Sequence, residues 1–394
     1  MIIGKVVDTA GHPLRSISVY LNNTSIGTTT NEKGEFMLDH IPQAKFRLIV
    51  SGIGCKTFDK MIDTRASIPY MSITMSAQAD LLKGAVVTAD DPEGWLHWGK
   101  LFTDLFVGTS PAARDCRILN PGVIRFRKND DNTLTAYANK PILLYNAGLG
   151  YDIRCTLEDF TYDFSGEVLA YSGEILFKDL ALTNRRKAAS WRKAREDVYR
   201  GSFLHFKRAF FTNTLDTQGF RLNRLVRVVN VHKQRANLLF AKRSQLVDTV
   251  KTDTVYVGTK KTFYYHVADS TDFYKKVLTA PDSLIDRQPL TADSVGFVED
   301  STTAGLYFPD SLEVVYLLEA NPIAYKRISK GWYQQHPVSR ITLVYNRPIY
   351  VLGNGFHYQA EDIKVTGYWA WSNTMGTLLP FDYISGPDYP AGDR

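Results

Sequence analysis

The sequence has few cysteines, no long apolar run and none of the short motifs that mark the common enzyme classes. Its three cysteines form no Cys-x-x-Cys pair, so a zinc or dithiol site of that kind has no support, while a disulfide between Cys116 and Cys155 stays open. No stretch approaches the roughly 18 apolar residues of a transmembrane helix. The eight histidines include no His-x-x-Glu or His-Glu-x-x-His pattern, and Gly-x-Ser-x-Gly and nucleotide-binding fingerprints are absent. The sequence therefore predicts no cofactor, no metal and no catalytic residue that a motif would reveal.

The length and composition predict a folded protein of more than one domain. The chain has 394 residues, of which 44% are hydrophobic and 22% charged, and the 12% share of aromatic residues favours β-structure. Its charge is unevenly distributed, because residues 185–243 hold sixteen Lys and Arg against three acids and residues 282–319 hold eight acids against one Arg. This layout is typical of two segments that face each other. No nucleic-acid-reading module accompanies it, so we expect no nucleic-acid partner.

The first 76 residues consist of short strand-forming runs separated by turn-forming sequences. Asn22-Asn23 and Asn31-Glu32-Lys33-Gly34 are examples of the turns, since Asn and Gly adopt left-handed backbone conformations easily. The spacing of the runs predicts a β-sandwich. The expected strands are Ile2–Val7, Ile17–Leu21, Ile26–Thr30, Glu35–Leu38, Phe46–Val50 and Met71–Met75.

Several of these runs carry a resemblance to a known family. Gly27–Phe36 (GTTTNEKGEF), with Gly4–Asp8 and Ile41-Pro42, resembles the carboxypeptidase-regulatory-like (transthyretin-like) domain of Bacteroidota envelope proteins. The resemblance implies a non-catalytic module that precedes transporters, barrels or peptidases. It also implies an envelope location, for a chain whose export leader is absent. One departure is Cys55, where the family commonly has an aromatic residue after Ile-Gly.

The rest of the chain predicts a larger α+β domain over residues 93–394, after a linker or exit strand at residues 77–92. The apolar spacing around Trp95 and Trp98 predicts a helix that ends at Gly108. Alternating residues between positions 118 and 176 predict antiparallel strands with one buried face. The fold class is therefore mainly β: a transthyretin/Ig-like sandwich followed by a domain with an antiparallel sheet and two main helices.

The second expected helix runs from about Trp191 to Thr212. Arg192 and Arg200 lie on its basic face, which favours ordinary packing with ion pairs and leaves binding to an anionic membrane surface as an alternative. Gly201 weakens the middle of this helix. Residues 221–231 then alternate basic and apolar side chains, as an exposed strand would.

Five Asp-Ser or Asp-Thr pairs, each followed by an apolar residue, occur in the irregular segment from Asp248 to about Asp310. They resemble the O-glycosylation acceptor pattern of exported Bacteroidota proteins, although the same pairs also form turns. Short strands are expected at Thr254–Val257 and Phe263–Val267, and further strands at Leu312–Leu318, Ile341–Tyr345 and Ile349–Leu352. The five pairs begin at Asp248, Asp253, Asp282, Asp293 and Asp310.

A Trp-rich segment containing Trp369 and Trp371 closes the chain. With Trp95 and Trp98, it resembles an uncharacterised Bacteroidota family that carries the regulatory-like module and brings no established activity. We therefore expect a non-enzymatic cell-envelope binding or scaffold protein, associated with an outer-membrane or envelope protein. The alternatives are a hydrolase of peptide or glycan whose site forms only in three dimensions, and a carbohydrate-binding protein. The candidate binding or interface residues are Trp95, Trp98, Trp369, Trp371, Arg192 and Arg200.

Overall fold

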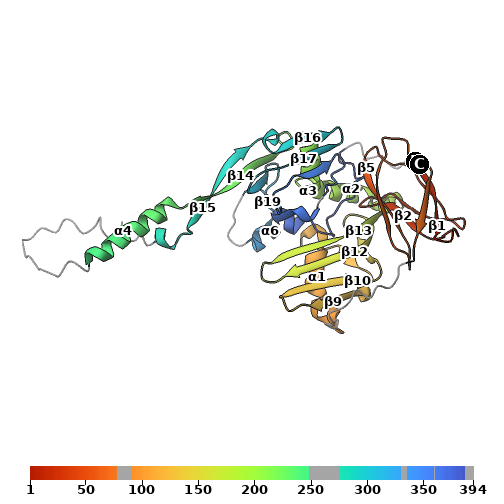
Figure 1. Ribbon diagram of the computed structural model, residues 1–394, viewed down its shortest axis with the longest axis horizontal. Coiled ribbons are helices and arrows are strands. Elements are labelled where there is room, and N and C mark those ends of the chain that lie inside the picture. Colours follow the sequence, from red (N-terminus) through yellow and green to blue (C-terminus); the bar gives the residue numbers. More distant parts are fainter. Residues whose placement is uncertain (78–90, 248–275, 330–334, 359, 387–394) are drawn as a thin grey trace, which may run out of the picture.

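The protein is mainly β, with most strands in antiparallel sheets. The computed structural model describes residues 1–77, 91–247, 276–329, 335–358 and 360–386. A β-sandwich formed by residues 1–77 lies at one end of the molecule, and the remaining described residues form what we call the body (Figure 1). The expected strands at Thr254–Val257 and Phe263–Val267, and most of the expected linker at 77–92, lie outside the described residues.

The sandwich consists of a three-stranded sheet, β4-β1-β7, and a four-stranded sheet, β3-β2-β5-β6. Alternate residues of β1 and β4 point into its core, which explains the pattern seen in the sequence. β6 was not expected. Its segment FDKMID buries only Ile62, and it pairs along one side with β5 alone. The strands are β1 (Ile2–Asp8), β2 (Ser18–Leu21), β3 (Gly27–Thr29), β4 (Glu35–Leu38), β5 (Lys45–Ser51), β6 (Phe58–Asp63) and β7 (Met71–Met75).

The first part of the body is a six-stranded antiparallel sheet covered by helix α1 (Gly94–Phe106). The long strand β12 lies at its centre, because β11 and β10 pair with its two halves on one side and β13 pairs along the other side. Cys116 and Cys155 are buried in the core of this layer as free thiols, so they form no disulfide. The strands are β8 (Cys116–Ile118), β9 (Ile124–Lys128), β10 (Thr133–Ala138), β11 (Ile142–Asn146), β12 (Tyr151–Asp163) and β13 (Val168–Asp179).

The second part of the body has its own hydrophobic cluster between two further sheets and helix α3. A five-stranded sheet has the order β15-β14-β18-β19-β21, and a three-stranded sheet has the order β16-β17-β20. Two short helices, α6 (Ile323–Ile328) and α7 (Tyr368–Ser372), complete it. The strands are β14 (Phe220–Val229), β15 (Ser283–Leu290), β16 (Gly296–Asp300), β17 (Thr303–Leu306), β18 (Ser311–Tyr316), β19 (Val338–Leu343), β20 (Ile349–Leu352) and β21 (Ile363–Gly367).

The expectation of two main helices is wrong, because the described residues contain four helices of nine residues or more. The single helix expected over 191–212 is in fact two, α2 (Arg185–Tyr199) and α3 (Phe203–Phe211). Gly201 separates them with a φ of +66°, a left-handed conformation that ends a helix. The fourth helix is α4 (Val231–Val247).

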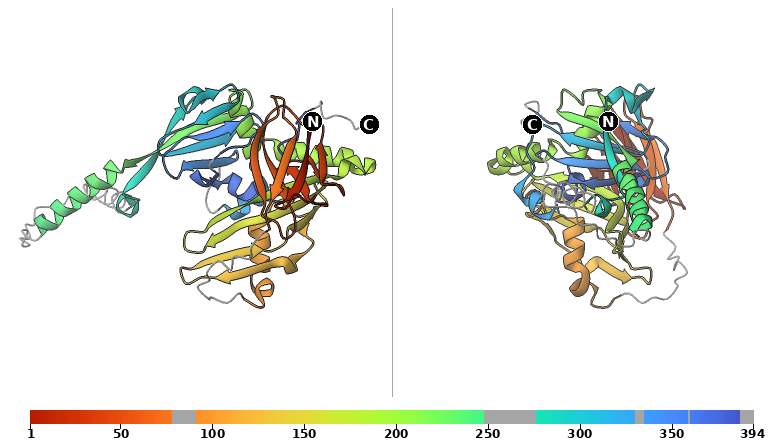
Figure 2. Two further views of the ribbon diagram at one scale, coloured as in Figure 1. Left: turned by 45° about the vertical axis from the view of Figure 1, so that its right-hand side comes forward. Right: turned by 90° about the vertical axis from the view of Figure 1, so that its left-hand side faces the viewer.

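Strand β14 and helix α4 extend into an arm that projects from the body, away from the sandwich (Figures 1 and 2). We define the arm as residues 227–247 and 276–286. The inner part of β14 is largely buried, whereas its last three residues and almost all of β15 are exposed. The prediction of an exposed strand over 221–231 therefore holds only for the outer part of β14.

The sandwich is joined to the body by main-chain hydrogen bonds as well as by side chains. The turn after β2 lies along the edge of β13: the amide of Asn23 donates to the carbonyl of Ile175 over 2.7 Å, and the amide of Phe177 donates to Thr24 over 2.9 Å. An exposed sheet edge readily pairs with other chains, and this contact covers it. The sandwich is therefore fixed to the central sheet by an isolated parallel bridge between Thr24 and Leu176, although the two belong to separate sheets.

Glu174 lies buried at this junction. It accepts a hydrogen bond from the hydroxyl of Tyr20 over 3.4 Å, and Arg47 lies 3.8 Å away. Burial, together with the nearby Glu158, raises the pKa of Glu174 to about 7. The junction thus holds a carboxyl group whose ionised form is unfavourable.

The basic and acidic segments of the sequence do meet. Arg224 of β14 pairs with Asp310 over 2.8 Å, and Lys233 of α4 pairs with Asp282 over 2.8 Å. Part of the uneven charge is thereby neutralised within the chain.

Candidate functional site

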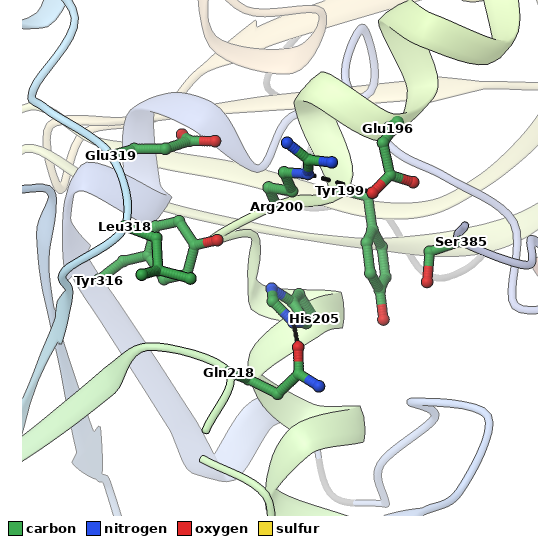
Figure 3. Close-up of a pocket in the computed structure, with 9 residues that line it drawn as sticks. All are labelled: Glu196, Tyr199, Arg200, His205, Gln218, Tyr316, Leu318, Glu319 and Ser385. Carbon is green, nitrogen blue, oxygen red and sulfur yellow. Dashed lines mark hydrogen bonds and ion pairs between the residues drawn. The ribbon is translucent and has the colours of Figure 1, made fainter. Parts of the chain in front are cut away.

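A pocket of about 350 Å³ lies where α2 ends, α3 begins and the loop after β18 approaches. Figure 3 shows the side chains that line it, which come from five separate parts of the chain. The volume is at the lower end for a ligand site, and suits one side chain or one sugar ring. The lining residues are Glu196, Tyr199, Arg200, His205, Gln218, Tyr316, Leu318, Glu319 and Ser385.

Gly201 determines the shape of the pocket. Its amide donates to Nδ1 of His205 over 3.1 Å, and its carbonyl accepts from Nε1 of Trp369 over 2.7 Å. A Cβ atom at this position would lie 2.4 Å from the ring of Tyr316. Only glycine therefore permits both the left-handed turn and the close approach of Tyr316.

His205 is a neutral, structural residue of the pocket wall. Because its Nδ1 accepts a hydrogen bond from the amide of Gly201, its Nε2 carries the hydrogen and donates to Oε1 of Gln218 over 3.1 Å. Its ring packs against Tyr199 and Phe220 at centroid distances of 4.8 and 4.9 Å. Burial lowers the pKa of His205. Both ring nitrogens are thus engaged.

The two carboxylates of the pocket differ in their surroundings. Glu196 accepts hydrogen bonds from Nε of Arg200 over 3.1 Å, from the hydroxyl of Tyr383 over 3.0 Å and from the amide of Gly386 over 3.3 Å. Glu319 is half-buried, and its carboxylate makes no hydrogen bond or ion pair with any of the described residues. Burial raises its pKa, and Arg200 opposes that rise. Figure 3 shows the guanidinium of Arg200 between the two carboxylates.

The C-terminal segment that supplies Ser385 is held in place by Arg208 of α3. Its guanidinium donates to the carbonyls of Tyr383 over 2.9 Å, Phe381 over 3.0 Å and Asn354 over 3.1 Å. A planar fork of donors suits such a set of fixed acceptors. The far end of the chain is therefore a built part of the pocket.

A buried basic pair lies next to Arg208 on α3. Nζ of Lys207 is 3.2 Å from Nδ1 of His357 and 4.8 Å from the ring centroid of Phe203. No carboxylate pairs with Lys207 among the described residues, and burial lowers its pKa to about 7. Burial also lowers the pKa of His357. This pair faces the apolar core and forms no part of the pocket.

Of the six candidate residues from the sequence, only Arg200 lines the pocket, and Trp369 supports it from behind through Gly201. Trp95 and Trp98 lie on α1 at the first hydrophobic cluster, whereas Trp369 lies in the second, so the structure does not bring the two pairs together. Arg192 is half-buried on α2. Sequence reasoning missed the other lining residues, and the only signal near them was Gly201, which marked a weak point of the expected helix.

The four candidate tryptophans, all of them in the described ranges, do not form an exposed platform. Trp95 packs against Phe126 at a centroid distance of 6.2 Å, and Trp371 packs against Tyr325 at 5.2 Å. A flat array of exposed rings is what sugar stacking needs. This packing gives the carbohydrate-binding alternative little support.

The core-facing side of α2, which would have to be free to enter a membrane surface, is covered, whereas Arg200 of the basic face is exposed. Trp191 and Arg195 are buried, and Arg195 forms a 2.8 Å ion pair with Asp179 of β13. No helix within the described ranges combines the length and apolar character needed to cross a bilayer. In the same part of the chain, no three His, Cys, Asp or Glu side chains are grouped so as to hold a metal ion.

The comparison with protein families identifies the sandwich. Residues 2–87 match the family model described as the CarboxypepD_reg-like domain, which confirms the carboxypeptidase-regulatory-like domain that Gly27–Phe36 indicated. The matched residues do not include the body, to which the pocket and the arm belong. A search of curated proteins found no match to the chain.

Proposed function

We propose that this chain is a non-enzymatic binding or scaffold protein of the cell envelope, and that the arm docks onto a partner protein with an acidic surface. The CarboxypepD_reg-like domain supports a non-catalytic, envelope role, because the family resemblance implies both. The observation that carries the proposal is the arm, which combines exposed apolar side chains with a basic charge.

The apolar part of this argument rests on exposure. Soluble proteins rarely display clustered large apolar side chains without a binding role. Those of the arm come from the outer end of β14, from α4 and from β15, and each is more than one-third exposed. They are Val228, Val229, Val231, Leu238, Leu239, Leu284 and Ile285.

The charge of the arm indicates what kind of partner would bind. Residues 227–247 and 276–286 carry six Lys and Arg against two Asp. One of the acids, Asp282, is already paired with Lys233. Arg227 and Arg235 are exposed and form no hydrogen bond or ion pair within the described residues. An acidic protein surface with apolar patches would complement this combination.

A hydrolase is the second candidate, since the pocket brings Glu196, His205 and Glu319 together. A general base must offer a free lone pair to the proton that it removes. Nδ1 of His205 already accepts from Gly201, and Glu196 already accepts three hydrogen bonds. Glu319 alone is free of such contacts with the described residues, so the pocket offers no pair of free acid–base groups and is better suited to holding a ligand than to proton transfer.

Photocrosslinking in the cells that naturally produce the protein tests the proposal. A benzoylphenylalanine at Val229 or Leu238 should crosslink the chain to one and the same envelope protein, whereas the exposed Met37 of the sandwich is the control position. The double variant Arg227→Glu/Arg235→Glu should abolish the crosslink, because its charge would repel an acidic partner.

The matched control is Arg114→Glu/Lys140→Glu, which changes the charge equally at two exposed residues outside the arm. It should retain the crosslink. The proposal fails if position 37 crosslinks equally well, if the product is a second copy of this chain, if charge reversal on the arm has no effect, or if the protein fractionates with the cytosol.

A further inference from the structure

The pocket beside Gly201 carries an inference about its ligand that is independent of the arm and of the proposed scaffold role. Its lining contains two carboxylates and one guanidinium, so its charge is negative with His205 neutral. Asp197 and Arg208 are not part of the lining, and their effects on Glu319 and His205 come from opposite charges. A ligand with a positive charge would balance the excess negative charge of the lining.

The excess charge can be assigned to one residue. Arg200 and Glu196 neutralise each other through their 3.1 Å contact. Glu319 is left half-buried and is not close enough to Arg200 to form an ion pair. Burying a carboxylate removes its hydrogen bonds to water, which costs free energy unless a donor of the protein replaces them. A cation that donates hydrogen bonds to Glu319 would reduce this cost.

The remaining walls also suit a small cation. The aromatic rings of Tyr199 and Tyr316 line the pocket, and ring faces attract ammonium groups. Gln218 and Ser385 add neutral polar groups. The volume of about 350 Å³ admits one lysine side chain or one amino-sugar ring.

We propose that this pocket binds a protonated primary amine, with Glu319 as the residue that accepts its hydrogen bonds. Two sources of this group fit the space: a lysine-type side chain of a peptide and an amino sugar. Binding requires no movement of His205 or Gly201, because both already belong to the rigid wall.

Isothermal titration of the full chain tests this proposal with two probes, the peptide acetyl-Gly-Lys-Gly-amide and glucosamine. At least one should bind, and its neutral partner, the acetyl-lysine peptide or glucose, should bind at least about tenfold more weakly because it lacks the charge. Whichever probe binds identifies the source.

Glu319→Gln should weaken that binding by about tenfold or more. Glu299→Gln, the same change at an exposed acid of β16, should leave it unchanged, and thermal unfolding should show both variants folded. The inference is overturned if neither amine binds up to about 10 mM, if the neutral partners bind equally, or if Glu319→Gln has no effect. None of these results bears on crosslinking at the arm, so the two proposals can fail separately.

Discussion

Gly201 is the position where we expect one added methyl group to be most damaging. Alanine in its left-handed conformation costs about 1–2 kcal/mol. The new Cβ would also lie 2.4 Å from Cδ1 of Tyr316, whose ring is buried between Phe220 and His205 and cannot swing aside. Overlap of this kind typically costs about 1–3 kcal/mol. We therefore expect Gly201→Ala to lower the free energy of unfolding by about 2–5 kcal/mol.

Urea unfolding followed by far-ultraviolet circular dichroism measures this effect. Gly54→Ala is the matched control, because Gly54 has a φ of +76° but no atom within 4 Å of its Cβ position, so only the backbone cost should remain. Gly201→Asn separates the two causes at one site. Asparagine tolerates the left-handed conformation yet keeps the Cβ, so it should be about as destabilising as alanine. If Gly201→Ala costs no more than Gly54→Ala, or if asparagine restores stability, the steric argument is wrong.

Two further predictions concern buried ionisable groups. Burial lowers the pKa of Lys207 from 10.5 to about 7, so protonation of this side chain favours the unfolded chain. The free energy of unfolding should therefore fall as the pH falls through that range, by up to about 1.4 kcal/mol per pH unit. Lys207→Met should flatten this part of the curve of unfolding free energy against pH, and an unchanged slope would contradict the burial. The pKa of Glu174 is raised from 4.5 to about 7, so its ionised form favours the unfolded chain and stability should fall as the pH rises through that range. Glu174→Gln should remove that fall, and its persistence would show that Glu174 is solvated.

The sequence was informative where one residue pattern determines one local structure. Alternation and turn residues located β4, β7 and β20 with the bounds that the structure has. β6 was missed because its charged residues Asp59 and Lys60 are exposed, leaving little apolar pattern to detect. The break between α2 and α3 was missed because a glycine inside a helical pattern is often tolerated. Whether Gly201 breaks the helix depends on Trp369 and Tyr316, which are distant in sequence.

The pocket could not be predicted for the same reason. Its lining joins α2, the loop before β14, the loop after β18 and the C-terminal segment, and no local pattern links these parts. Arg200 was identified, but only as one basic residue among many. What makes it part of a site is the half-buried Glu319, which lies more than a hundred positions further along the chain.

The main-chain bonds between the turn at Asn23 and strand β13 have a geometric consequence. A domain held only by a linker could rotate freely, whereas this sandwich cannot turn without breaking hydrogen bonds to Ile175 and Phe177. Sandwich and arm lie at opposite ends of the molecule (Figure 1). A partner that holds the sandwich would therefore also fix the direction of α4. The 17 residues of this helix reach outward over about 25 Å. The protein would then act as a spacer of fixed orientation, presenting the basic arm at a set distance from its anchor.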